Sequence, residues 1–213
     1  MEPLPGKLIL VRHHESEWNK AGLWTGVRDR HLTDYGFQKS ADMGFLLRDV
    51  KIGKAFSSMQ VRAIETLSSM LEAMGQYRVD IEHSKTLNER DYGEYTGKSK
   101  WDMQKLVGEE TWNKIRREWD YPVPGGETLK MVYERAVPFY LEKILPDVRL
   151  GTNVLVVAHG NSCRALIKYI ESVSDEGVSK VEMPFGGILI YSLNEKGRMV
   201  SKSERLIESH VNA

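Results

Sequence analysis

Arg12, His13, His14 and Glu15 stand in immediate succession after the apolar run LILV. A guanidinium offers planar pairs of N–H donors to a phosphate, and an imidazole can act as a nucleophile or carry a proton. Histidine and glutamate are also acceptable ligands for zinc, and all four could equally be ordinary polar loop residues. The rest of the chain has to distinguish these three possibilities.

Arginine and histidine also follow two other short apolar runs. When such runs are parallel strands of one sheet, their carboxyl ends meet at one edge, and open α/β sheets bind ligands there. Three strand ends that each deliver Arg or His are hard to dismiss as separate surface ion pairs, and the set suits a dianionic phosphate. The residues at the other two ends are Ser57, Ser58 and Arg62 in one case, and His159, Gly160, Asn161 and Arg164 in the other.

A metal centre is the sharpest competing interpretation of the histidines. Adjacent residues on an extended chain point to opposite faces, so His13 and His14 cannot easily bind one ion. The sequence has no HExxH and no paired-cysteine motif, and the nearby arginines would repel a cation. We therefore expect no metal at this site.

Cys163 is the only cysteine of the chain, so it cannot form an internal disulfide. Cysteine phosphatases place an arginine six positions after the nucleophile, and Tyr169 stands there in this chain. We expect Cys163 to be a small packing residue on its helix.

Apolar patterning predicts the elements that must position these residues. Short apolar runs without alternation are typical of strands buried on both faces, and apolar residues at helical spacing lie between them. Strands that alternate with helices predict an α/β fold, a three-layer α/β/α sandwich with a mostly parallel central sheet. The expected strands are Lys7–Arg12, Lys54–Ser58, Asn153–His159 and Ile188–Leu193, the last followed by a turn at Asn194–Gly197 and an edge strand; the expected helices run from an N-cap at Thr33 to Leu46, over Gln60–Met74, over Glu127–Val148 with a kink at Pro138, and over Asn161–Ile170.

Tyr77–Gly126 interrupts this alternation. The segment is rich in Tyr, Trp, Lys and Glu, with short helical patterns at Lys100–Val107 and Glu110–Trp119. We interpret residues 1–213 as a single domain in which residues 77–126 form a helical insertion that lies over the sheet and covers the site at the strand ends.

Composition excludes several function classes. The chain has 213 residues, and Lys plus Arg equal Asp plus Glu at 30 each, so no overall field attracts nucleic acid or an anionic membrane. No apolar run approaches the roughly 20 residues that cross a bilayer, and MEPLPGK lacks a signal-peptide pattern. With a single cysteine, these features predict a cytoplasmic protein.

Six sequence blocks resemble those of the cofactor-dependent phosphoglycerate mutases, a branch of the histidine phosphatase superfamily. The blocks occur in the family order from about Lys7 to Leu193, and as a set they are highly specific. They are VRHHESEWN, WTG, SSMQVRAIET, LNERDYGEYTGKSK, WNKIRREW and VVAHGNSCRALIKY.

This resemblance implies a role for each matching residue. The family interconverts 3- and 2-phosphoglycerate in glycolysis, is primed by 2,3-bisphosphoglycerate and uses no metal. Its members include monomers, dimers and tetramers, so a homo-oligomer is among the implied assemblies. The implied residues are His13 as the nucleophile, Glu89 as the general acid and base, Arg12, Arg62 and His159 around the transferred phosphoryl group with Asn19, Gly160 and Asn161, and Thr25, Gly26, Arg90, Tyr92, Lys100, Arg116 and Arg117 on the rest of the substrate.

One ambiguity and one departure from the family pattern keep alternatives open. A phosphomonoesterase of the same superfamily begins with the same phosphohistidine, and Arg116–Arg117 could be an exposed charged helix because Glu118 and Asp120 lie beside them. The family writes Arg-His-Gly where this chain writes Arg12-His13-His14, so a catalytically impaired relative used for binding is a third possibility. At this position we expect either a strained backbone or an imidazole that crowds the pocket or adds a donor at its rim.

Overall fold

The computed structural model describes residues 5–207. Residues 1–4, which begin the segment without a signal-peptide pattern, and residues 208–213, beyond the recognised motifs, lie outside the described residues. Within the described range, no helix is both long and apolar enough to cross a membrane.

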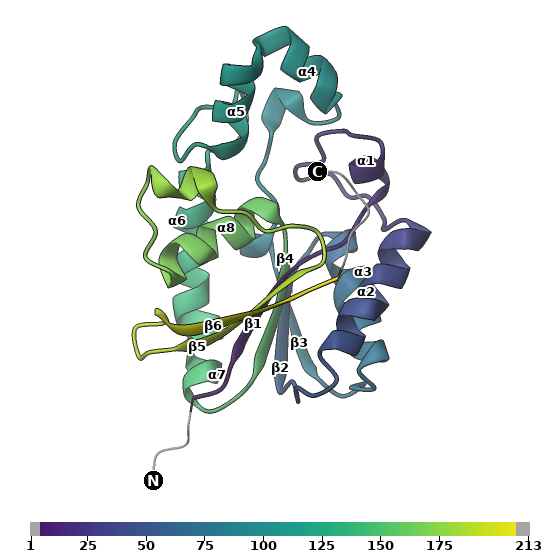
Figure 1. The fold of residues 1–213 in the computed structure, drawn as a ribbon, viewed down its shortest axis with the longest axis vertical. Coiled ribbons are helices and arrows are strands. Elements are labelled where there is room, and N and C mark those ends of the chain that lie inside the picture. The colour runs from purple at the N-terminus through teal and green to yellow at the C-terminus, as the bar shows by residue number, and fades with distance from the viewer. Residues whose placement is uncertain (1–4, 208–213) are drawn as a thin grey trace.

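A six-stranded sheet runs through the middle of the described part of the chain (Figure 1). In the spatial order β3-β2-β4-β1-β5-β6, the first four strands are mutually parallel, whereas β5 and β6 are antiparallel to their neighbours. The expected mostly parallel sheet is confirmed. The strands are β1 (Leu8–Arg12), β2 (Lys54–Ser58), β3 (Asp80–Ser84), β4 (Val154–Ala158), β5 (Gly187–Leu193) and β6 (Met199–Leu206).

Both faces of the central strands are apolar because both are covered. On β1, Leu8 and Leu10 belong to one buried cluster, and the alternate residues Ile9 and Val11 belong to another. Helices α6 to α8 contribute to the first cluster, and α2 and α3 to the second, which gives three layers (Figure 1). This double burial explains the uninterrupted apolar runs in the sequence.

The helices largely follow the predicted spans. The N-cap at Thr33 is confirmed, since its side chain accepts a hydrogen bond from the backbone N–H of Gly36. The helices are α1 (Glu17–Lys20), α2 (Asp34–Leu46), α3 (Val61–Ala73), α4 (Lys100–Val107), α5 (Glu109–Arg117), α6 (Leu129–Phe139), α7 (Leu145–Arg149) and α8 (Gly160–Ile170), with 3-10 turns at Lys85–Leu87, Gly93–Tyr95 and Gly177–Lys180.

The long helix that the sequence predicts over Glu127–Val148 is continuous from Leu129 to Arg149 but changes its winding just after Pro138. The helix α6 runs past this proline, continues as a π-helical stretch at Tyr140–Ile144 and ends as α7. Proline lacks the N–H of the regular ladder and its ring clashes with the preceding turn, so the chain changes its winding nearby.

The segment predicted as an insertion contains a strand that the sequence analysis missed. Asp80–Ser84 forms β3, which pairs with β2 at one edge of the sheet. Because β3 has a neighbour on one side only and its residues are mostly exposed, it lacks the apolar run that identifies the central strands. The first part of Tyr77–Gly126 therefore extends the sheet rather than covering it.

Helices α4 and α5 stand beyond the carboxyl ends of the parallel strands (Figure 1). They share a small apolar cluster that is separate from the two clusters on the sheet. Its buried members are Trp24, Met103, Trp112, Ile115 and Val123. We refer to α4 and α5 together as the lid.

Candidate active site

The register of β1 and β4 brings two histidines together. Arg12 pairs with Ala158 across the two parallel strands, and the backbone N–H of His13 donates to the carbonyl of Ala158 at 2.9 Å. The next residues on each strand are His13 and His159, whose ring centroids lie 4.9 Å apart. Both side chains are buried.

The tautomer of His13 follows from its hydrogen bonds. Its Nδ1 lies 2.5 Å from the carbonyl oxygen of His14, which can only accept, so Nδ1 carries the proton. The Nε2 atom then holds a lone pair and accepts a hydrogen bond from Arg62 Nε at 3.3 Å. Burial, then Arg62 and Arg12, lower the pKa of His13 well below its usual value. At neutral pH the ring is therefore neutral, and Nε2 carries no proton.

Two arginines flank the His13 ring. Arg62, on the first turn of α3, donates to the carbonyls of Arg28 and Gly26 at 2.9 Å each, and burial lowers its pKa to about 10. Arg12 donates from Nη1 to the carbonyl of Met183 at 2.7 Å, while its buried Nε has no partner among the described residues. Burial lowers the pKa values of both arginines. Both nevertheless remain cationic at neutral pH, because the ordinary pKa of a guanidinium is very high.

His159 is held from behind by Ser58. The two side chains meet at 2.7 Å through Ser58 Oγ and His159 Nε2. The other ring nitrogen, Nδ1, is buried without a partner among the described residues. Burial, then Arg62 and His13, lower the pKa of His159, so the ring is neutral at neutral pH.

Glu89 reaches the same place from the loop after β3. Its Oε1 accepts from the backbone N–H groups of Arg90 at 2.7 Å and Asn161 at 3.1 Å, which fixes the carboxylate. Its own N–H donates to Gln60 Oε1 at 2.7 Å. A Cβ at Gly160 would lie 3.4 Å from Arg12 Cζ and 3.6 Å from Glu89 Oε2, so the start of α8 lies close to both groups.

A pocket of about 510 Å3 lies over these residues and is bounded by the lid. Six cationic side chains line it against three carboxylates, which leaves an excess of positive charge for an anionic ligand. Burial, then Arg12, lower the pKa of Lys100 to about 8, and burial also lowers the pKa of Arg116. The cations are Arg12, Arg62, Lys100, Arg116, Arg117 and Arg164, and the carboxylates are Glu89, Glu109 and Glu182.

Most of the residues expected from the sequence meet in this pocket. The expected residues that line it are Arg12, His13, Asn19, Thr25, Gly26, Arg62, Glu89, Tyr92, Lys100, Arg116, Arg117, Gly160 and Asn161. His159 lies behind His13 rather than in the lining. Arg90 differs from expectation, because its buried guanidinium donates to the carbonyl of Ile115 at 2.6 Å and does not line the pocket.

Several contributors carry no signal of their own in the sequence. Gln60 joins Gly26 to Glu89, because its Nε2 donates to the first residue's carbonyl at 3.0 Å and its Oε1 accepts from the second. Phe185 lies 3.7 Å below the guanidinium of Arg12, measured from Cζ to the ring centroid. Contacts between distant segments bring these residues to the site. Arg164 also lines the pocket, and the sequence analysis did identify it, because it follows the third strand.

His14 neither has a strained backbone nor lies in the pocket lining, in contrast to the two expectations from the sequence. Ser172 is the one described residue other than glycine with a positive φ, so the backbone at His14 is unstrained. The imidazole is fully buried, accepts from the N–H of Glu15 at 2.8 Å and contacts Tyr35 and Phe185, outside the pocket lining. Both expected outcomes were therefore wrong, because the side chain points into the layer beside α2.

The described residues contain no group of three or more His, Cys, Asp or Glu side chains placed to hold a metal ion. His13 and His159 do lie together, but arginines and a serine surround them. Cys163 is buried against the carbonyl of Val11, and burial raises its thiol pKa.

A family model described as the histidine phosphatase superfamily, branch 1, matches residues 8–204. This chain belongs to that superfamily. The expected family is confirmed, and so is the expectation of an enzyme.

Relatives of this chain cover almost its whole length. A 2,3-bisphosphoglycerate-dependent phosphoglycerate mutase of Parvibaculum lavamentivorans is 42% identical over 207 residues, which are 96% of this chain and 98% of the relative. One from Bradyrhizobium diazoefficiens is 43% identical over 197 residues, 92% and 95% of the two chains. A mycobacterial glucosyl-3-phosphoglycerate phosphatase superimposes with a TM-score of 0.80 at 19% identity, covering 97% of this chain and 100% of the other, which shows the shared fold.

The buried histidines predict how the stability of this protein depends on pH. The pKa values of His13, His14 and His159 all lie below the ordinary 6.5, that of His14 at about 4, chiefly because of burial. Below about pH 6.5 the unfolded chain binds protons that the folded chain does not, so the free energy of unfolding falls by about 1.4 kcal/mol per pH unit for each proton. Urea denaturation between pH 7.5 and 5 measures this loss.

His14→Asn provides the matched control, because Asn can accept from Glu15 N–H but does not titrate. Its stability should fall less steeply over the same pH range, by the share of one histidine. A wild-type stability that stays level or rises as the pH falls would contradict the neutral buried histidines.

Proposed function

We propose that this protein is a 2,3-bisphosphoglycerate-dependent phosphoglycerate mutase that interconverts 3- and 2-phosphoglycerate through a phosphohistidine at His13. The observation that supports it most is a neutral His13, unprotonated at Nε2, in the lining of a pocket that has six cations and three carboxylates. Relatives that bear this name are about as long as the chain itself and 42–43% identical to it. The reaction belongs to glycolysis and gluconeogenesis and is consistent with a cytoplasmic enzyme.

The pocket fits an anionic primer. Arg12 Nε, His159 Nδ1 and Thr25 Oγ1 are buried polar atoms without partners among the described residues, and all three belong to residues in or directly behind the pocket. Buried donors of this kind are costly unless an acceptor meets them, and phosphate oxygens are strong acceptors. Bisphosphoglycerate supplies the phosphoryl group that His13 receives, and the mechanism proposed here requires no metal.

Transfer to and from His13 needs positive charge around the three equatorial oxygens of the phosphoryl group. We assign Arg12, Arg62 and His159 to this task, with Asn19 and the backbone at Gly160 and Asn161 as further donors. When Ser58 donates to Nε2 of His159, the Nδ1–H of that ring is free to bind an oxygen. Because these groups are held in place beforehand, they need no reorganisation as charge develops.

Glu89 handles the proton of the substrate hydroxyl. The hydroxyl oxygen attacks the phosphorus of phosphohistidine, the P–N bond breaks, and the carboxylate takes the hydroxyl proton; in the reverse direction it returns the proton to the leaving oxygen. The hydrogen bonds from Arg90 and Asn161 N–H to Oε1 leave Oε2, on the side of Gly160, for this proton.

The remaining substrate groups meet the lid and the loop around Gly26. We assign Thr25, Gly26, Tyr92, Lys100, Arg116 and Arg117 to the carboxylate and the second phosphate of a phosphoglycerate, the small-molecule partner expected here. Arg90 contributes indirectly, because it holds α5 through Ile115. Enclosure by the lid favours transfer back to substrate over hydrolysis, since a mutase must keep water from phosphohistidine.

An assay that couples 2-phosphoglycerate formation to a detectable signal tests the proposal. With 3-phosphoglycerate alone the wild-type enzyme should turn over slowly, and catalytic amounts of 2,3-bisphosphoglycerate should activate it. His13→Ala should abolish turnover and acid-labile phosphoryl labelling. Release of inorganic phosphate without 2-phosphoglycerate would instead establish a phosphomonoesterase, and a wild-type chain that never labels would favour a binding protein.

Glu89→Gln tests the proton transfer. The amide has nearly the shape of the carboxylate but cannot accept the proton, so turnover should fall by roughly 10² to 10⁴. The Michaelis constant should change little, and labelling of His13 by bisphosphoglycerate should remain detectable. Turnover within about threefold of wild type would show that another group carries the proton.

A further inference from the structure

Arg164 uses every N–H group of its guanidinium inside the protein. It lies on α8, one turn after Asn161, and its side chain is almost fully buried. Arginine has five N–H donors, and five contacts within hydrogen-bond distance are present. Nε donates to Val181 O at 3.1 Å, Nη1 to Arg116 O and Asn161 Oδ1 at 3.0 Å each, and Nη2 to Arg117 O at 2.7 Å and Val178 O at 2.9 Å.

None of these five acceptors is a carboxylate. Arg164 forms no ion pair within the described residues; its charge is met by carbonyl and amide oxygens, two of them at the end of α5. The carboxyl-terminal end of a helix carries partial negative charge, which stabilises a cation there. Burial lowers the pKa of Arg164 to about 10, so the group stays charged at neutral pH.

The two helix carbonyls belong to the residues assigned to the substrate. Arg116 and Arg117 end α5, and their side chains line the pocket while their carbonyls point to Arg164. Arg117 also pairs with Glu182 at 2.7 Å, and Glu182 follows the segment whose carbonyls Arg164 holds. One guanidinium therefore connects α8, the end of the lid and the chain that faces it.

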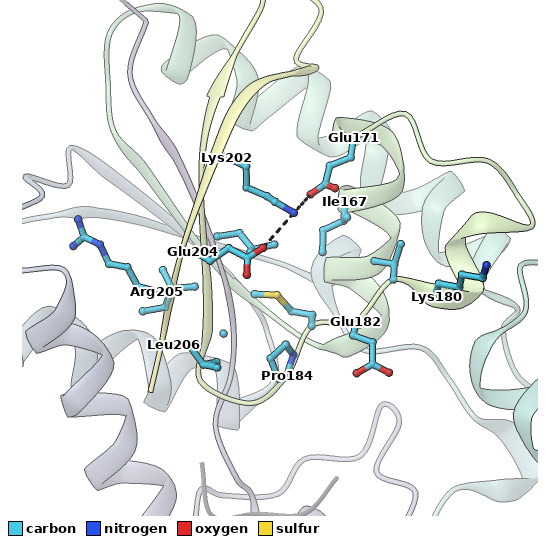
Figure 2. Close-up of a pocket in the computed structure, with 14 residues that line it drawn as sticks. Ile167, Glu171, Lys180, Glu182, Pro184, Lys202, Glu204, Arg205 and Leu206 are labelled. Atoms are coloured by element: carbon cyan, nitrogen blue, oxygen red, sulfur yellow. Dashed lines mark ion pairs between the residues drawn. The ribbon is translucent and has the colours of Figure 1, made fainter. Parts of the chain in front are cut away.

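A second cavity lies on the other side of that facing chain. Residues 180–184 border a second cavity of about 330 Å3, between them and strands β5 and β6 (Figure 2). In this cavity Lys202 pairs with Glu171 and Glu204 at 3.2 Å each, away from Glu182 and Pro184 (Figure 2). Because Glu182, Met183 and Pro184 line both cavities, they form a thin wall. The bonds from Arg164 to Val178 and Val181 help to fix this wall.

We propose that Arg164 is a positioning residue that holds the end of α5 and the segment 178–184, which includes the wall, against α8. It thereby keeps Arg116 and Arg117 where a phosphoglycerate needs them. This inference rests on the proposed function, because it concerns the substrate that the two arginines bind. It adds a role for a residue that need not touch the reacting phosphoryl group. Its loss should affect recognition of the remote anionic group more than chemistry at His13.

Arg164→Met keeps the length of the side chain and removes all five donors. Displacement of a binding group by about 1 Å can cost up to about 10²-fold, so we expect the KM for 3-phosphoglycerate to rise about tenfold or more. The kcat/KM for hydrolysis of p-nitrophenyl phosphate, which has no carboxylate for Arg116 and Arg117, should fall several-fold less than the kcat/KM for 3-phosphoglycerate. Methylguanidinium added to Arg164→Ala should recover part of the lost affinity.

Arg198→Met is the matched control. Arg198 also donates to a carbonyl, that of Tyr169, and to Ser172 Oγ, and its guanidinium lies 3.8 Å from the ring of Tyr169, outside the pocket. Removing it should cost stability without raising the KM. An unchanged KM for 3-phosphoglycerate in folded Arg164→Met would overturn the proposal. An equal fall in kcat/KM for 3-phosphoglycerate and p-nitrophenyl phosphate would overturn it as well. If Arg164→Met fails to fold, Arg164→Lys, which keeps the charge but has three donors for five acceptors, should show the same difference between the two substrates to a smaller extent.

Hydrogen exchange separates this proposal from the proposed function. Amide exchange in residues 109–117 should be faster in Arg164→Met than in wild type and unchanged in Arg198→Met. This result does not depend on which substrate the enzyme uses. A wild-type enzyme inactive on 3-phosphoglycerate would refute the function, whereas unaltered exchange in α5 would refute the role of Arg164.

Discussion

The hydrogen bond from His13 Nδ1 to the carbonyl of His14 is the interaction on which the site depends. It places the single proton of a neutral imidazole on the side away from the pocket, and so leaves the Nε2 lone pair facing Arg62. The bond exists because the chain turns immediately after β1, and β1 is fixed by its register with β4. The tautomer of His13 and the orientation of its Nε2 are therefore consequences of strand pairing.

The same arrangement is electrostatically expensive in the absence of an anion. Arg12, Arg62 and Arg164 are buried with few carboxylates near them, and each has a pKa lowered by burial. Backbone carbonyls compensate part of this cost, since Met183, Gly26, Arg28, Val178 and the end of α5 all accept from them. The negative charge of a phosphorylated ligand would balance the positive charge that the carbonyls leave uncompensated. The same buried charge that makes the empty site costly therefore favours anions as ligands.

Sequence patterns predicted the parts of the fold that are buried on both sides. The central strands, the cap at Thr33 and the helix at Lys100–Val107 follow from apolar runs and local capping, and the strand ends gather His13, Arg62 and His159 as expected. Edge strand β3 was missed because exposure on one side removes the apolar signal. The direction of His14 and the turning of Arg90 toward Ile115 depend on contacts between distant segments, which spacing along the chain does not reveal.

The state of the His13 ring at neutral pH tests the account most directly. Nitrogen-15 NMR of the histidine side chains, assigned by comparison with His13→Ala, distinguishes the two neutral tautomers and the imidazolium. The account predicts that His13 at pH 7 is neutral, protonated on Nδ1, and stays so well below pH 6.5, the ordinary pKa of histidine. An imidazolium at pH 7, or a neutral ring with its proton on Nε2, would contradict the account.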